Sequence, residues 1–320
     1  MDIGSLLTHE VVEWFNARWS PEMGAIDGHD LRFLADLLHE AQPAKVVEIG
    51  CASGISTSLI AMILAQIGPS SITSFDLGTQ FYADPSKKVG YLTAELPSLA
   101  HVKIEIVTGR ACLAVPEYFG LQSVDFGFVD ASHQHPWPLI DTLVLLPLLR
   151  TGAYLAHHDP VMAWNPAHFA TGPKILQLLL PDHVRVDFNS RVKGGIENSL
   201  KTRNKSDNIF ALHKPADHRP LGSRLGQGFL IGWDIGFVKY GSSAISEGFS
   251  RSLIKYLRSH YEPDVADAFV VGLKRYNPIR PDGKVGAKRH QTNRQAHYPA
   301  AQRRPTTAWP PVQLGQVPRP

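Results

Sequence analysis

The chain has 320 residues, of which 43% are hydrophobic and 19% are charged, and this composition is typical of globular proteins. Its two cysteines, Cys51 and Cys112, are too few for a disulfide framework. No apolar run approaches the roughly 18 residues of a membrane-spanning helix, and the first residues lack the pattern of a secretory signal. We therefore expect a protein without spanning helices in a reducing compartment, the cytoplasm.

The net charge of +3 is distributed unevenly along the chain. Residues 274–320 carry about +9, whereas residues 1–273 carry about −6. The C-terminal segment also contains eight prolines and little apolar periodicity, which predicts a disordered basic tail. Its charge would attract phosphates, but its aromatic residues are scattered rather than spaced for base stacking. Contact of the tail with nucleic acid or a membrane is therefore disfavoured.

Apolar periodicity predicts a helix over residues 1–20 and a second helix over residues 27–40. Strands and helices then alternate. The predicted strands are 45–49, 71–76, 101–108, 124–130, 152–157, 184–188 and 208–213. The predicted helices are 54–67, a helical or mixed segment 81–96, 111–119, 138–149 and 172–180. This order predicts an α/β fold with a doubly wound, seven-stranded, mostly parallel sheet. The last two strands, joined only by a loop, are expected to form an antiparallel hairpin at one edge.

Domain organisation follows from the same pattern. Residues 1–24 form an N-terminal helical segment, and residues 25–215 form the α/β domain. Its long basic loop, residues 189–207, is expected at the surface. Residues 216–273 include a predicted helix, 243–260, and form a C-terminal extension. We interpret the extension as an accessory subdomain or a dimerisation arm, which leaves a homodimer open.

The loop after the first strand, residues 46–54, carries the strongest functional pattern. Glu48 places a charge inside an apolar strand, which is costly unless the carboxylate has partners. Gly50 and Gly54 permit a tight turn and close backbone approach to a ligand. The following helix begins with free N–H groups that suit an anion. Asp76 ends the next strand, where an acid in doubly wound folds binds ribose hydroxyls.

The pattern Glu48-x-Gly50-x-x-x-Gly54, followed by Asp76, resembles the class I S-adenosylmethionine-dependent methyltransferases. The stretches 128–133, 148–152 and 158–159 are similar to the small-molecule O-methyltransferase branch, which includes catechol, caffeoyl-CoA and macrolide-sugar enzymes. The resemblance covers about residues 25–215 and implies a Rossmann-like methyltransferase fold with S-adenosylmethionine as cofactor. It implies cofactor contacts for Glu48, Gly50, Ser53, Gly54, Asp76, Gly109 and Arg110. Arg110 departs from the relatives, which often have an acid there.

Two alternatives to an S-adenosylmethionine site remain open for this loop: a dinucleotide site, or a fold that has lost cofactor binding. A dinucleotide site requires Gly-x-Gly-x-x-Gly, and Ala52 replaces its second glycine. In the second alternative, the loop binds no cofactor. Asp76 and the missing middle glycine together favour S-adenosylmethionine.

Aspartates and histidines follow the fourth and fifth predicted strands, whose ends meet at one edge of the sheet. Asp130, His133 and His158 are candidate catalytic residues, because methyl transfer to oxygen requires alignment and loss of the acceptor proton. His133 stands where the catechol-type enzymes have their general base. The resemblance also implies a divalent metal ion held by Asp130, His158 and Asp159. Because His158 replaces an acid, a transition metal or no metal at all are alternatives to magnesium. His135 and His157 are interpreted as structural.

We therefore expect O-methylation of a small-molecule hydroxyl group. One alternative is an RNA or protein methyltransferase that docks through the tail. Another is a methyltransferase-like binding protein without catalysis. The sequence does not encode the acceptor in any pattern that we can read.

Overall fold

The computed structural model describes residues 6–20, 26–164, 170–191, 200–203, 208–235 and 244–277. Most of the predicted basic tail, most of the loop 189–207 and part of the predicted N-terminal segment therefore lie outside the described residues. Within the described ranges, no helix is long and apolar enough to cross a bilayer.

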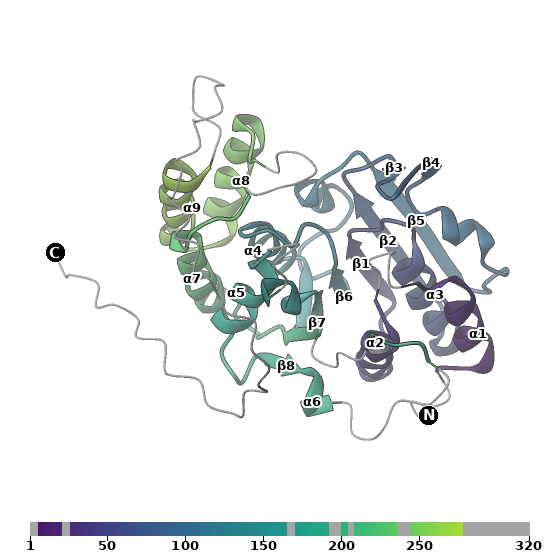
Figure 1. Ribbon diagram of the computed structural model, residues 1–320. Coiled ribbons are helices and arrows are strands. Elements are labelled where there is room, and N and C mark those ends of the chain that lie inside the picture. The colour runs from purple at the N-terminus through teal and green to yellow at the C-terminus, as the bar shows by residue number, and fades with distance from the viewer. Residues whose placement is uncertain are drawn as a thin grey trace, which may run out of the picture. The chain divides into compact units, whose positions relative to one another are not determined.

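A seven-stranded sheet forms the centre of the fold, with the strand order β5-β2-β1-β6-β7-β9-β8 (Figure 1). Its strands are β1 (Lys45–Ile49), β2 (Ser70–Asp76), β5 (Val102–Thr108), β6 (Val124–Val129), β7 (Leu149–His158), β8 (Arg185–Asp187) and β9 (Ile209–His213). The five strands from β5 to β7 pair in parallel, whereas β9 is antiparallel to both β7 and β8. The predicted doubly wound, mostly parallel sheet and its antiparallel edge hairpin are confirmed.

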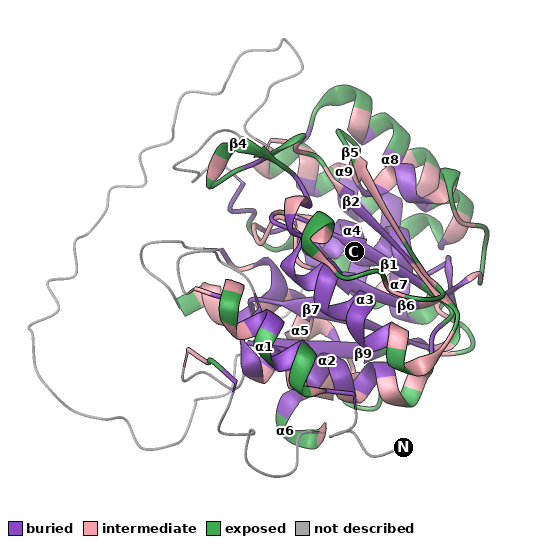
Figure 2. Ribbon diagram, turned by 90° about the vertical axis from the view of Figure 1, so that its right-hand side faces the viewer, coloured by how far each residue is buried: buried purple, intermediate pink, exposed green. Residues whose placement is uncertain are grey.

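Helices cover both faces of this sheet, as Figure 1 shows. One face carries α1 (His9–Arg18), α2 (Gly28–Ala41) and α3 (Ile55–Ile67). The other carries α4 (Trp137–Leu145), α5 (Gly172–Leu179), α7 (Arg219–Gly226), α8 (Glu247–His260) and α9 (Pro263–Tyr276). Because side chains alternate along a strand, Val46 and Val47 of β1 enter opposite hydrophobic clusters. The strands β2, β1, β6, β7 and β9 are consequently buried along most of their length (Figure 2), whereas the edge strands β5 and β8 are only partly buried.

Several segments differ from their predicted form. Residues 81–96 contain a hairpin of β3 (Gln80–Phe81) and β4 (Asp84–Lys88), followed by the 3-10 helix η3 (Tyr91–Glu95). The hairpin was not predicted because β4 is mostly exposed and has no apolar alternation. The helix predicted over 138–149 ends at Leu145, ahead of a proline, and Leu149 already begins β7. Shorter elements complete the described chain, namely η4 (Cys112–Glu117), η5 (Pro160–Trp164), α6 (Phe188–Arg191) and η6 (Gln227–Leu230).

The C-terminal helices pack against α4 and share its hydrophobic cluster. The Tyr261 hydroxyl donates to the Leu143 carbonyl at 2.6 Å, and the Tyr256 hydroxyl donates to the Val144 carbonyl at 2.8 Å. Phe269 of α9 is fully buried in the same cluster. These contacts join the extension to one face of the sheet. Its role as a subdomain or dimerisation arm stays a prediction.

Candidate functional site

The loop between β1 and α3 passes very close to the end of β6. Gly50 and Gly54 have positive φ angles of 97° and 87°, a region that favours glycine. A Cβ atom on Gly50 would lie 2.2 Å from the carbonyl oxygen of Asp130. The Asp130 amide in turn donates to the Ile49 carbonyl at 2.8 Å. Glycine at position 50 therefore allows the loop after β1 to contact the residue that follows β6.

Glu48 lies beneath this loop with a fully buried side chain. Its carboxylate accepts hydrogen bonds from Ser56 Oγ at 2.5 Å, from Ser74 Oγ at 2.6 Å and from the Thr57 hydroxyl. Burial raises the pKa of Glu48 to about 7, although these hydroxyl groups act in the opposite direction. Glu48, a predicted cofactor residue, thus links β1 by hydrogen bonds to β2 and to the first turn of α3, the elements on either side of the glycine loop.

Asp76 at the end of β2 holds the same loop from its side. Its Oδ2 accepts from the backbone N–H groups of Cys51 at 3.1 Å and Ala52 at 2.9 Å, and its Oδ1 accepts from that of Gly78 at 2.7 Å. The structure therefore brings Asp76 and the glycine loop together; its predicted contact with the cofactor stays a prediction. The next residue, Leu77, is 73% exposed. It was not among the predicted site residues, although an apolar residue directly after a strand-end acid is visible in the sequence.

The other predicted cofactor residues occupy different positions. Ser53 is buried within the loop. Gly109 follows β5 with a φ of 71°. The Arg110 amide donates to the Asp76 carbonyl at 3.2 Å, so this turn does lie beside Asp76. The Arg110 guanidinium instead pairs with the Glu117 carboxylate at the surface.

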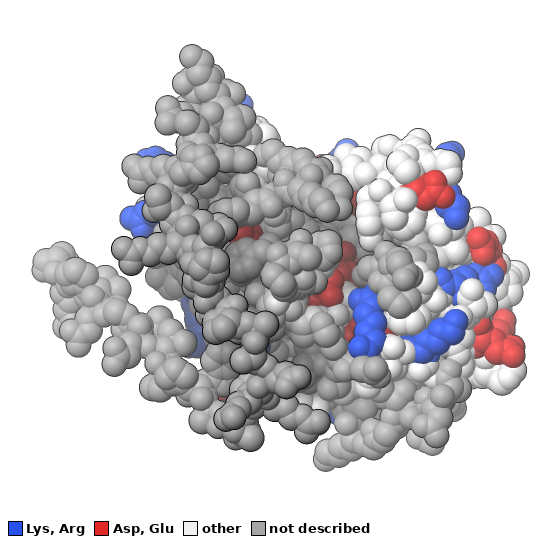
Figure 3. Space-filling view, viewed as in Figure 1, with Lys and Arg blue, Asp and Glu red and all other residues white. Residues whose placement is uncertain are grey.

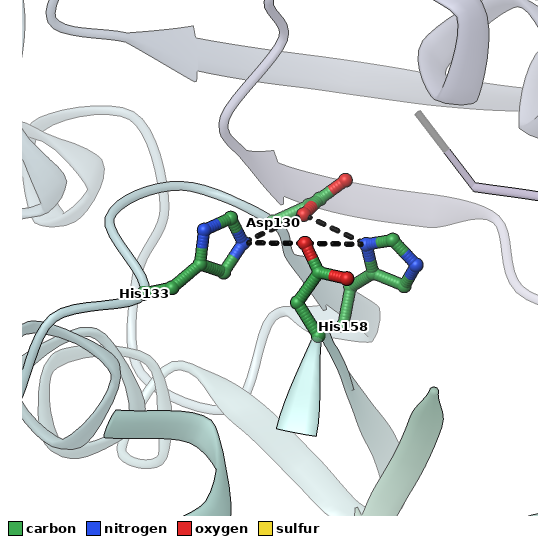
Figure 4. A group of neighbouring side chains, drawn as sticks. Asp130, His133 and His158 are labelled. Atoms are coloured by element: carbon green, nitrogen blue, oxygen red, sulfur yellow. Dashed lines mark hydrogen bonds and ion pairs between the residues drawn. The ribbon is translucent and has the colours of Figure 1, made fainter. Parts of the chain in front are cut away.

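The predicted catalytic and metal-binding residues form one cluster after β6 and β7. His133 Nε2 lies 3.1 Å from Asp130 Oδ1 and 3.4 Å from Asp159 Oδ2. His158 Nδ1 lies 3.0 Å and 3.6 Å from the same two oxygens. Figure 4 shows the imidazole rings of His133 and His158 on either side of Asp130. The structure therefore brings together four residues that lie in two separate parts of the sequence.

The segment that contains this site resembles a known protein family. Residues 47–160 match a family model described as a methyltransferase domain. This part of the chain is a methyltransferase domain. The matched segment runs from the glycine loop to the Asp159 carboxylate. No curated protein matches the chain.

Three solved structures are similar to this chain at low sequence identity. The cofactor-bound protein Rv0187 from MTB is 17% identical, with a TM-score of 0.46 over 65% of this chain and 89% of that chain. The O-methyltransferase TomG from Streptomyces achromogenes, in complex with SAM, is 20% identical, with a TM-score of 0.41 over 65% and 88%. The O-methyltransferase from Bacillus cereus, in complex with SAH, is 20% identical, with a TM-score of 0.42 over 66% and 91%. Likenesses this distant say nothing about the substrate of this chain.

Two further buried side chains contact the Asp/His cluster, namely Asp30 and Asn208. Asp30 of α2 places Oδ2 3.0 Å from His158 Nε2, and both side chains are essentially fully buried. Asn208, just before β9, donates from Nδ2 to Asp159 Oδ1 at 2.6 Å. Neither residue was predicted from the sequence, because α2 and β9 are brought to the cluster only by the fold. A polar residue on the buried face of an amphipathic helix was the one available signal for Asp30.

Charges within the cluster shift the pKa of several of its members. Burial lowers the pKa of His158, but Asp130, Asp159 and Asp30 outweigh burial and raise it well above its ordinary value. Burial likewise acts to raise the pKa of Asp130, but His158 and His133 hold it below its ordinary value. His133 is 22% exposed, whereas the His158 side chain is 0% exposed. His133 is therefore the imidazole that a bound molecule could reach.

His135 and His157 do not join the cluster. Burial lowers the pKa of His135 to about 4, and its Nε2 lies 2.9 Å from the Gly228 carbonyl oxygen. Burial lowers the pKa of His157 to about 3, and its ring stacks on Phe210 with the centroids 5.4 Å apart. Both are neutral packing residues at ordinary pH, in keeping with their structural interpretation.

Proposed function

We propose that this methyltransferase uses S-adenosylmethionine to methylate a hydroxyl group of a small molecule. The observation that supports the proposal most is the contact between the glycine loop and Asp130. It brings a cofactor-type loop against a cluster of two carboxylates and two imidazoles at one edge of the sheet. Ligands of open α/β sheets bind at this carboxyl edge.

The cofactor would bind over the glycine loop and the N-terminus of α3, whose N–H groups suit its carboxylate. An ionised carboxylate offers about four acceptor sites, and the loop and Gly78 use three of those on Asp76. One site remains for a ribose hydroxyl. The exposed Leu77 side chain offers an apolar surface for the adenine ring.

The acceptor would approach His133, the partly exposed imidazole of the cluster. In the reaction, the acceptor oxygen forms a bond to the methyl carbon as the carbon–sulfur bond breaks, and the electron pair stays on sulfur. The acceptor proton passes to the cluster. Close alignment of the two reactants supplies much of the rate, and proton removal supplies a further factor of about 10²–10⁴.

Calorimetry with S-adenosylmethionine and transfer of labelled methyl groups to phenols and sugars test the proposal separately. Asp76→Ala should weaken cofactor binding, whereas Asp84→Ala, an acid of the exposed β4 strand, should not. Asp130→Asn should retain the cofactor and lose methyl transfer. Unchanged cofactor affinity in Asp76→Ala would reject the assigned pocket. Cofactor binding without transfer to any acceptor would favour the non-catalytic alternative.

The alternative of a nucleic-acid acceptor receives no support from the described part of the face shown in Figure 3. On the face shown in Figure 3, acidic and basic side chains are interspersed over the described part. Several basic residues of the described chain are paired with acids, including Arg18 with Glu95 at 3.0 Å. A groove that tracks phosphates would instead present one sign of charge.

A further inference from the structure

The loop that carries His133 joins β6 to α4 and contains no helix or strand, so its shape depends on contacts from other segments. At its start, the Asp130 amide donates to the Ile49 carbonyl at 2.8 Å. Further along, the Gly172 amide at the start of α5 donates to the His133 carbonyl at 2.9 Å. A Cβ atom on Gly172 would lie 2.7 Å from that carbonyl oxygen. The first residue of α5 therefore packs directly against the His133 backbone.

The C-terminal extension, which lies beside α4 and α5 in Figure 1, contacts the same loop two residues after His133. The His135 carbonyl accepts from the Asp234 amide at 3.1 Å. His135 Nε2 donates to the Gly228 carbonyl at 2.9 Å, because a carbonyl oxygen can only accept. His135 and Asp234 are both buried, where a polar group that loses its partner is costly. These contacts therefore restrict the positions that the loop can adopt.

Asp234 links the extension to the start of α5 as well as to the loop. Its Oδ2 accepts from the Thr171 amide at 2.7 Å and from the Thr171 hydroxyl at 2.9 Å. Thr171 directly precedes Gly172, the donor to His133. The Asp234 carbonyl also accepts from Gln134 Nε2 at 3.4 Å. A carboxylate at a helix N-terminus interacts favourably with the helix dipole. Asp234 thus holds α5 with its side chain and the loop with its backbone.

We propose that the C-terminal extension positions His133, and that Asp234 is the residue through which it acts. Asp234 acts indirectly, through Thr171 and His135. The use of His133 in proton removal rests on the proposed function. Asp234 lies outside residues 47–160, so the segment matched by the family model does not itself contain this support.

The competing explanation is that these contacts only stabilise the fold. Tyr261 supplies a matched control, because its hydroxyl joins the same extension to α4 through the Leu143 carbonyl at 2.6 Å. Tyr261→Phe removes this buried hydrogen bond and leaves the contacts of the His133 loop in place. A purely structural role predicts that Asp234→Ala and Tyr261→Phe both lower stability and affect His133 equally. A positioning role predicts that only Asp234→Ala changes the surroundings of His133.

The experiment uses the full chain with nitrogen-15-labelled histidine and records the imidazole resonances by NMR at one fixed pH. The spectrum of His133→Ala identifies the His133 resonances by their absence. We expect Asp234→Ala to shift or split these resonances and Tyr261→Phe to leave them unchanged. Asp234→Asn should restore them, because an amide oxygen can accept both hydrogen bonds from Thr171.

Methyl transfer to phenols and sugars gives a second readout. Asp234→Ala should lower kcat by about 100-fold, the cost of misplacing a catalytic group by about 1 Å. S-adenosylmethionine affinity should stay unchanged, because Asp234 contacts Thr171 and the His133 loop rather than the glycine loop. Thr171→Val removes only the hydroxyl contact with Asp234 and should cause smaller changes of the same kind. It takes the place of Asp234→Ala should that variant fail to fold.

Unchanged His133 resonances in Asp234→Ala, or equal changes in Tyr261→Phe, would overturn the positioning role. Unchanged resonances in Thr171→Val would overturn it where Asp234→Ala does not fold. The NMR spectra require neither cofactor nor acceptor, and they therefore keep the two proposals apart. The expected spectral changes without methyl transfer to any acceptor reject only the proposed function. Unchanged spectra in an active methyltransferase reject only the role of Asp234.

Discussion

Replacing Glu48 with glutamine should stabilise the fold by an amount that grows with pH. The carboxyl group of Glu48 is fully buried, and burial raises its pKa from 4.5 to about 7. In the unfolded chain the group ionises near its ordinary value. Between the two pKa values the folded state therefore binds more protons, and stability falls as the pH rises. The whole shift corresponds to about 3 kcal/mol, of which about 2.5 kcal/mol develops between about pH 5 and pH 8.

Urea titrations of both proteins at several pH values in this window measure the effect. The free energy of unfolding of Glu48→Gln, relative to the original protein, should increase steadily with pH. Glutamine can still exchange hydrogen bonds with Ser56, Ser74 and Thr57, because an amide both donates and accepts. Glu105→Gln removes a partly exposed carboxylate of β5 and controls for the change in charge. A Glu48→Gln difference that is constant, or that shrinks as the pH rises, would refute the reasoning.

Three further predictions concern the site and the tail. Gly50→Ala should cost at least about 2 kcal/mol in a denaturation assay and impair cofactor binding, because its Cβ would meet the Asp130 carbonyl oxygen at 2.2 Å. Gly120→Ala, with nothing within 4 Å, should be nearly neutral. His133→Ala should lower kcat by about 10²–10⁴ while calorimetry shows unchanged S-adenosylmethionine affinity; full turnover would remove His133 from the mechanism. Deleting residues 278–320 should leave small-molecule turnover intact, whereas loss of salt-sensitive RNA binding would favour the docking alternative.

Buried strands were predictable because they read as continuous apolar runs, and β1 was found at its predicted residues. The parallel sheet and its antiparallel edge followed from the alternation of elements. The hairpin of β3 and β4 was not predictable, because its strands are short and largely solvent-exposed. The start of β7 was assigned to a helix, because the apolar residues of 143–149 fit either structure when read without their neighbours.

The site was predictable to the extent that its residues follow strands. Asp130, His133, His158 and Asp159 were expected to converge because parallel strands end at one edge, and they do. The contacts of Glu48 with hydroxyl groups and the place of Asp30 depend on side chains from other elements. Such contacts leave no spacing pattern in the sequence, so only the fold could reveal them.

The approach of Gly50 to Asp130 has a geometric consequence for how this enzyme can change. Neighbouring strands lie about 4.8 Å apart, and β1 and β6 are hydrogen-bonded neighbours. Under the proposed function, the spacing of β1 and β6 therefore fixes the distance between the methyl donor and the group that accepts the proton. Neither loop can move to admit a larger acceptor without breaking a backbone contact. Selectivity for acceptor size would then depend on the segments that lie over the carboxyl edge of the sheet. Substitutions in those segments could change the acceptor without changing the distance between the reacting groups.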